Sequence, residues 1–180
     1  MATLTDQDVE ETYYNLDDII ALDAHITCTF DESTPAGIFT LLGVKAADAG
    51  KATKAEIPLW MLPTIKAHCD VTLPKAYNES MQGVLVSHAA SANLEALQPD
   101  FYAVGVCLTK HLSDGQPLAR CLAATLTQRI GGIVGPALQG LARPARCDSL
   151  ERRLFDTALQ SRKSSHQWFT TATTRKRKRN

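Results

Sequence analysis

Apolar positions follow two different periods along this chain, and the change falls near Pro74. Before that proline, residues 25–30 alternate polar side chains with apolar or β-branched ones, which predicts a strand with one buried face. The other elements predicted before Pro74 are a short helix over 13–20, a strand over 37–42 after a turn at 31–36, a polar loop over 43–54, a strand at Glu56 and Ile57, and a strand over 70–73.

After Pro74 the apolar side chains recur every three or four residues, which is typical of amphipathic helices. A first helix opens at Pro74, and a second carries apolar positions from Leu94 to Leu112. We expect Pro99 to restart this second helix, because proline has no N–H to donate. A third helix carries apolar positions from Leu118 to Ile133.

The third helix is predicted to lose its regularity after Ile130, where poor helix formers cluster. These are Gly131, Gly132, Gly135, Pro136 and Gly140. Further on, Asp148 and Glu151 have the spacing of a capping box, which predicts the start of the last helix. That helix carries Leu154, Phe155, Ala158 and Trp168 on its apolar positions.

These elements predict an α+β fold that is mostly α, with a small β-rich module followed by a helical bundle. The change of period divides the chain into a β-rich domain over 1–74, a helical domain over 75–170 and a basic tail over 171–180. At 180 residues, the chain is long enough to bury a core as one domain with a small appendage.

Composition excludes several classes of protein. No apolar run reaches the roughly 18 residues that a membrane-spanning helix needs, so no membrane partner is expected. The cysteines are odd in number and widely scattered, and no Cys-x-x-Cys pair exists, so neither a disulfide framework nor a zinc site is expected. They are Cys28, Cys69, Cys107, Cys121 and Cys147, and we expect them to be reduced and mostly buried.

No set of residues along the chain assembles a catalytic site. Residues 131–135 are glycine-rich like a phosphate-binding loop, but no strand precedes them and no Lys-Ser or Lys-Thr follows. A nucleophilic serine in a Gly-x-Ser-x-Gly turn is also missing. We therefore expect no catalytic residue, no metal and no cofactor.

The net charge of zero conceals two ends of opposite charge. Residues 1–32 hold nine acidic side chains and no lysine or arginine, and residues 143–180 hold eleven basic side chains against three acidic ones. The chain ends in a run of cations that is typical of a nuclear import signal or of a non-specific nucleic-acid tail. A solubilising tail with no receptor is the alternative; the run consists of Arg175, Lys176, Arg177, Lys178 and Arg179.

Two short motifs, supported by others in the same order, resemble subunit 3 of the eukaryotic GINS complex. The first is the aromatic and acidic stretch over 13–21, Tyr-Tyr-Asn-Leu-Asp-Asp-Ile-Ile-Ala. The second is Glu-Ile-Pro-Leu-Trp over 56–60, which resembles a strand-to-helix turn of that family. Stretches at 73–77, 99–105 and 154–156, with Trp168 downstream, are similar to the helical domain of the family, so the resemblance covers about 160 residues.

The resemblance implies a β-rich B domain followed by a helical A domain, in a non-enzymatic subunit of a nuclear heterotetramer. Its implied partners are the three sister subunits and, through the complex, the MCM ring helicase and the cell-division-cycle 45 protein, with DNA contacted indirectly or weakly. The implied role is to support replication initiation and fork progression. A basic-tailed nucleic-acid-binding protein that works alone is the alternative, and a small hydrolase is a distant third.

Two groups of residues follow from this reading as candidates. Pro58 and Trp60 are predicted to anchor the small module, with Trp60 buried against its strands. Aromatic residues are enriched at subunit interfaces, although a lone aromatic residue is by default part of the core. The candidate interface residues are Tyr13, Tyr14, Leu16, Asp17, Asp18, Phe101, Tyr102, Leu154, Phe155 and Trp168.

Overall fold

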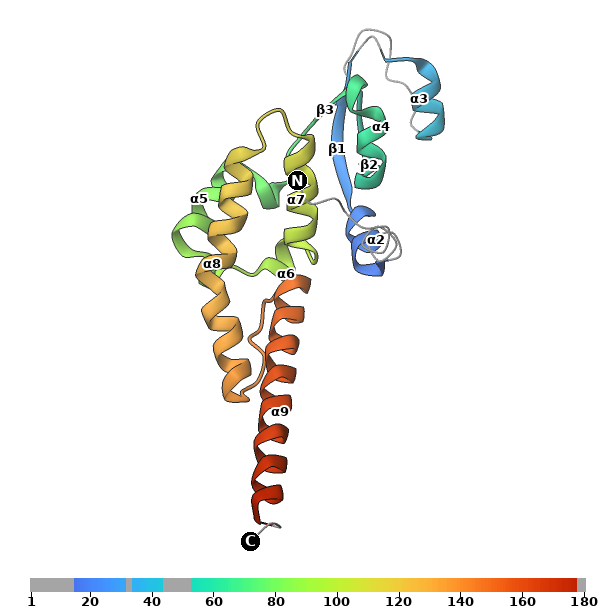
Figure 1. Ribbon diagram of the computed structural model, residues 1–180. Coiled ribbons are helices and arrows are strands. Elements are labelled where there is room, and N and C mark those ends of the chain that lie inside the picture. Colours follow the sequence, from blue (N-terminus) through green and yellow to red (C-terminus); the bar gives the residue numbers. More distant parts are fainter. Residues whose placement is uncertain (1–14, 32–33, 44–52, 178–180) are drawn as a thin grey trace, which may run out of the picture. The chain divides into compact units, whose positions relative to one another are not determined.

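A computed structural model describes residues 15–31, 34–43 and 53–177 of the chain, and Figure 1 shows it coloured along the sequence. Two compact units emerge. The first comprises 1–82 and 103–120, and the second comprises 83–102 and 121–180. The predicted fold class is confirmed, because a small sheet precedes a region built from helices. The domain boundaries expected after residues 74 and 170 remain predictions.

The first unit contains an antiparallel sheet of three strands in the order β2-β1-β3. The central strand β1 spans His25–Phe30, pairing Thr27 with Glu56 of β2 and Cys28 with Val71 of β3. Its alternate side chains are buried, as the period-two pattern predicts. All three predicted strands in these places are confirmed, with β2 over Thr53–Pro58 and β3 over Cys69–Val71.

The strand predicted over 37–42 is wrong, because the helix α3 spans Ala36–Leu41. A short apolar run cannot distinguish a strand from a helix by period alone. Within α3 the buried side chain is Phe39, whose ring meets that of Phe30 edge-on with 5.4 Å between the centroids. This aromatic contact joins the helix to the sheet.

The segment after β2 corrects the predicted role of Trp60. A 3-10 turn over Leu59–Met61 leads into α4 over Leu62–Ile65, with Pro63 in the first turn of that helix. Leu59 and Leu62, three residues apart on one side of this turn, are fully buried. Trp60 lies between them and its side chain is 55% exposed, so it is not the buried residue of the turn.

Proline positions divide the helical region much as predicted. A 3-10 turn over Lys75–Tyr77 follows Pro74, and α5 spans Glu79–His88. Pro99 separates α6 from α7, which confirms the predicted restart. The remaining elements are α2 over Leu16–Leu22, 3-10 turns over Lys66–His68 and Ala89–Ser91, α6 over Leu94–Leu97, α7 over Phe101–His111, α8 over Gln116–Gln139 and α9 over Ser149–Arg177.

The irregularity predicted after Ile130 is not present, because α8 continues through all its glycines and Pro136 to Gln139. Packing compensates for poor propensity there, since Ile133 and Ala137 are buried against Phe155 of α9. The helix ends at Gly140, whose φ of +76° is the left-handed conformation that glycine adopts readily. Its N–H donates to Ala137 and that of Leu141 to Pro136, the two bonds of a Schellman motif.

Candidate partner interface

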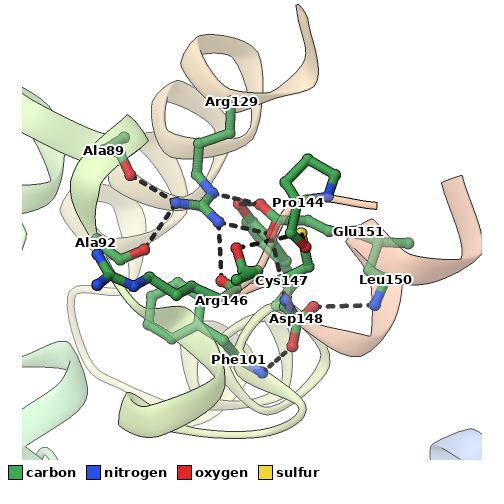
Figure 2. A network of polar contacts seen from close by, with 12 residues as sticks. Ala89, Ala92, Phe101, Arg129, Pro144, Arg146, Cys147, Asp148, Leu150 and Glu151 are labelled. Carbon is green, nitrogen blue, oxygen red and sulfur yellow. Dashed lines mark hydrogen bonds and ion pairs between the residues drawn. The ribbon is translucent and has the colours of Figure 1, made fainter. Parts of the chain in front are cut away.

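The predicted capping box opens α9 and also connects it to α7. The Asp148 carboxylate accepts a hydrogen bond from the Leu150 N–H at 3.0 Å, and Glu151 accepts one from the Asp148 N–H at 3.2 Å. The second Asp148 oxygen accepts from the N–H of Phe101, the first residue of α7, at 2.7 Å. One carboxylate thus satisfies free N–H groups at two helix starts, as Figure 2 shows.

Arg129 of α8 forms a buried, two-pronged ion pair with Glu151. Its Nε lies 2.6 Å from one carboxylate oxygen and its Nη2 lies 2.8 Å from the other. The carbonyl groups of Ala89, Ala92 and Arg146 accept the remaining N–H groups at 2.7 to 3.1 Å. All five guanidinium donors therefore have partners, which is the condition under which a buried charge is tolerated.

The charges of this network shift the pKa values of its members. Hydrogen bonding to Glu151 raises the pKa of Arg129. Burial, followed by the nearby Glu151 charge, raises the pKa of Tyr102, whose hydroxyl donates to Glu151 at 3.1 Å. Burial raises the pKa of Asp148 to about 6, against the opposing effect of the backbone N–H groups that it accepts from. Figure 2 shows the Arg129 guanidinium directed at Glu151, so this ion pair holds α8 and the start of α9 together.

Beyond this network, the side chains of α9 become progressively more exposed. Phe155 is buried against α8, and Leu154, Ala158 and Leu159 are partly buried beside it. Every residue from Gln160 to Thr171 is exposed, and Figure 1 shows α9, in red, continuing past the end of α8. We call residues 160–177 the distal arm of α9.

The distal arm carries two neighbouring aromatic side chains. Trp168 is 66% exposed and Phe169 is 65% exposed. Their rings meet edge-on with 5.0 Å between the centroids. Exposed aromatic residues of this size are unusual on a chain that works alone and are typical of contact surfaces.

Three of the predicted interface residues are buried inside the chain itself. Phe101, Tyr102 and Phe155 are at most 5% exposed, so they belong to its own core and are not available to a partner. The physical reason is tertiary packing, because each occupies the face of its helix that packs on the buried network or on α8. Leu154 is partly buried beside Phe155, and Trp168 remains a candidate.

The N-terminal candidates form a small exposed patch. Asn15 caps α2, and Asp17 and Asp18 follow in its first turn. The exposed aliphatic side chains of the helix are Leu16 at 71%, Ile19 at 50% and Ile20 at 61%. Sequence reasoning placed Ile19 and Ile20 on a helix but did not identify them as surface residues. Tyr13 and Tyr14 lie outside the described residues.

Only part of the basic run lies within the described residues. Arg175, Lys176 and Arg177 are the last residues of α9, whereas Lys178 and Arg179 lie outside the described residues.

Arg129 is the functional residue that the sequence analysis did not identify. One available signal was an arginine between Leu126 and Ile133, at three and four residues, within an otherwise apolar stripe.

The glycine-rich residues 131–135 are helical and do not form a loop.

All five cysteines are free thiols, and four of them are buried. Burial raises the pKa of Cys28 to about 12. Within the described ranges, no helix has the length and apolar character to cross a membrane, and no three His, Cys, Asp or Glu side chains gather as metal ligands.

The described part of the chain is thus an α+β protein that presents exposed apolar helix surfaces, on α2 and on the distal arm. Several curated proteins that are similar to this chain share one name. The DNA replication complex GINS protein PSF3 of Phaeosphaeria nodorum is 27% identical over 174 residues, which cover 88% of this chain and 96% of that protein. Its namesake from Candida albicans is 26% identical over 174 residues, covering 88% and 97%.

A third protein of this name, from Eremothecium gossypii, is 28% identical over 131 residues, which cover 65% of this chain and 70% of that protein. No family model matches the chain. The relatives confirm the resemblance that the motifs carry, because over most of its length this chain is similar to proteins named as GINS subunit PSF3.

Proposed function

We propose that this chain is a non-enzymatic subunit of a GINS-type heterotetramer that supports DNA replication in the nucleus. The observation that carries the proposal is the extent of the similarity, which covers 96% and 97% of two relatives named as subunits of that complex. A shared domain alone would leave most of the relative uncovered. The exposed apolar side chains of α2 add support, because a subunit needs surfaces that its own chain does not cover.

At a finer level, the proposed mechanism is bridging. The chain joins three sister subunits, and the assembled complex contacts the MCM ring helicase and the cell-division-cycle 45 protein without hydrolysing nucleotide. We assign α2 to these contacts, because its exposed Leu16, Ile19 and Ile20 stand next to Asp17 and Asp18. Apolar side chains beside carboxylates suit a partner surface that is apolar at its centre and basic at its rim.

Co-expression with the three sister subunits tests the assembly. We expect a stoichiometric complex, and poor solubility of the chain when it is expressed alone, because uncovered apolar patches promote aggregation. A well-behaved monomer that ignores these partners would contradict the proposed function.

The assignment of α2 has its own test within the same experiment. The double variant Leu16→Ser, Ile20→Ser should weaken the recovery of at least one partner. Leu41→Ser is the matched control, because Leu41 is 88% exposed on α3, outside the patch. Equal recovery with both variants would remove the assignment of α2 and leave the assembly itself standing.

The basic run is proposed to direct nuclear import. Residues 170–180 fused to a cytoplasmic reporter should bring that reporter into the nucleus, and the same segment with all five cations replaced by alanine should not. A reporter that stays in the cytoplasm with either segment would leave a solubilising tail as the remaining role.

A further inference from the structure

The distal arm of α9 has the charge of a polyanion-binding element. Asp156 is the last acidic residue of the chain, and the arm that follows it carries five lysines and arginines: Arg162, Lys163, Arg175, Lys176 and Arg177. In the described part of the chain, no carboxylate pairs with Arg162 or Lys163. These two cations are therefore available to an external anion.

The helix places Arg162 and Lys163 at one end of the arm and residues 175–177 at the other. Because α9 is continuous to Arg177, Lys163 and Arg175 stand twelve residues apart on a single helix, which corresponds to about 18 Å. Trp168 and Phe169 lie between the two groups and are both about two-thirds exposed. The arrangement is a pair of exposed aromatic rings flanked by cations on both sides.

The pattern of the arm does not suit a partner helix. A helix that packs against another presents apolar side chains at every third or fourth position over several turns. From Gln160 to Arg177, the apolar residues are Trp168, Phe169 and Ala172, and the rest are Ser, Thr, Gln, His, Lys or Arg. The proximal part of α9 does have such a stripe, and it is already buried against α8.

From this arrangement we infer that the distal arm binds single-stranded nucleic acid. The cations contact phosphates, and Trp168 and Phe169 stack on unpaired bases, which is the combination that strand-binding proteins use. Arg162 and His166 are four residues apart and Phe169 follows three later, so a cation, an imidazole and an aromatic ring share one face of the helix. This activity goes beyond membership of a complex and does not depend on it.

Fluorescence anisotropy with a labelled oligothymidine of about 20 nucleotides tests the inference. The full chain is used together with whatever subunits co-purify with it. We expect binding that weakens steeply between about 50 and 200 mM salt. The double variant Arg162→Ala, Lys163→Ala should reduce the magnitude of the slope of log K against log salt concentration by about 1.4. Each phosphate contact that is lost removes about 0.7 from this slope for a single strand.

The aromatic pair should act differently from the cations. The double variant Trp168→Ala, Phe169→Ala should weaken strand binding by roughly fivefold to a hundredfold and leave the salt slope unchanged, because stacking releases no counterions. A duplex of the same length should be insensitive to this variant, since its bases are already stacked. Circular dichroism checks that α9 stays helical.

The matched control is Lys110→Ala, Arg120→Ala, which removes two exposed cations outside α9. Equal weakening by this control would overturn the inference, because the effect would then follow from overall charge. Absence of strand binding in a preparation that retains its partners would also overturn it, and would leave the proposed function intact. If the aromatic variant keeps strand binding and loses a partner subunit, Trp168 and Phe169 form a protein interface instead.

Discussion

In α9, the residues from Ser149 to Leu159 are held by a buried ion pair and an apolar contact, whereas those from Gln160 to Thr171 have every side chain exposed. Both stretches are uninterrupted α-helix. They therefore differ in what surrounds the helix and not in local conformation. The comparison shows that one element can serve as core at one end and as contact surface at the other.

The proximal part packs one face into the interior of its unit. Its start satisfies free N–H groups through Asp148, its first turn carries the charge that neutralises Arg129, and Phe155 fills the space against α8. The distal arm retains exposed cations and aromatic rings. Mutations of equal size should thus have unequal effects on the two parts, and the following changes test that expectation.

The largest effect should come from Arg129→Met. This change leaves the Glu151 carboxylate buried beside an apolar side chain, which typically costs about 3–5 kcal/mol. The double variant Arg129→Met, Glu151→Leu should recover part of that loss, because neither charge then remains unpaired. Urea unfolding followed by circular dichroism measures both. A single variant within about 0.5 kcal/mol of the wild type would mean that the ion pair does not hold α9.

Phe155→Ala should come next, and it isolates the apolar contact from the ion pair. Truncating a buried phenylalanine lowers the unfolding free energy by about 3–5 kcal/mol. The loss is at the lower end of that range where neighbouring side chains can move into the cavity. Ile133 and Ala137 are those neighbours. The unfolding free energy measures the loss, and hydrogen exchange of the α8 amides near Ala137 should rise with it. Unchanged exchange there would show that α8 does not depend on α9.

Gly140→Ala tests the end of α8, beside the first cation of the distal arm. The backbone at Gly140 has a φ of +76°, which an alanine rarely adopts. The added Cβ would also lie 2.5 Å from the guanidinium of Arg162. That side chain can move away, so the backbone strain should dominate, at about 1–2 kcal/mol. Gly132→Ala is the control, because a Cβ there meets nothing within 4 Å, and it should stabilise the helix by about 1 kcal/mol. Thermal unfolding should therefore give a lower Tm for Gly140→Ala than for Gly132→Ala. The opposite ranking would contradict the Schellman motif at the end of α8.

A smaller effect is expected from pH, through Asp148. Its folded pKa of about 6 lies above the ordinary value of 3.8, so the folded state binds the proton more tightly than the unfolded state. The stability that comes from protonation is fully present below the ordinary pKa and is lost as the pH rises through about 6. Between pH 7 and pH 5, the wild type should gain about 1 kcal/mol relative to Asp148→Asn, which cannot titrate. Parallel stability curves for the two proteins would contradict the raised pKa.

The smallest effect on stability should come from Trp168→Ala, despite the size of the side chain. At 66% exposure it contributes little to its own chain, and surface substitutions usually stay within about 0.5 kcal/mol. The same unfolding assay as for Phe155→Ala gives a direct contrast between two aromatic residues of one helix. A loss above about 2 kcal/mol would mean that the distal arm packs on its own chain.

What the sequence determined by itself is local. The alternation in 25–30 predicts β1, Pro99 divides α6 from α7, and Asp148 with Glu151 three residues later predicts the start of α9. Each of these signals depends on backbone geometry within a few residues, so no distant contact is needed to interpret it. The motifs that resemble GINS subunit 3 could be recognised for a related reason, because each is a short stretch of neighbouring residues.

Only the tertiary structure decided which of these residues are buried. Leu59 lies inside and Trp60 outside although they are neighbours, and Phe155 and Trp168 lie on one helix with opposite exposure. Arg129 occupies an apolar stripe, and its charge is tolerated there because it pairs with Glu151, which is 22 residues away. The continuity of α8 through Pro136 likewise depends on Phe155 of another helix. In each case the free energy that settles the outcome comes from a partner distant in sequence, which periodicity and propensity do not register.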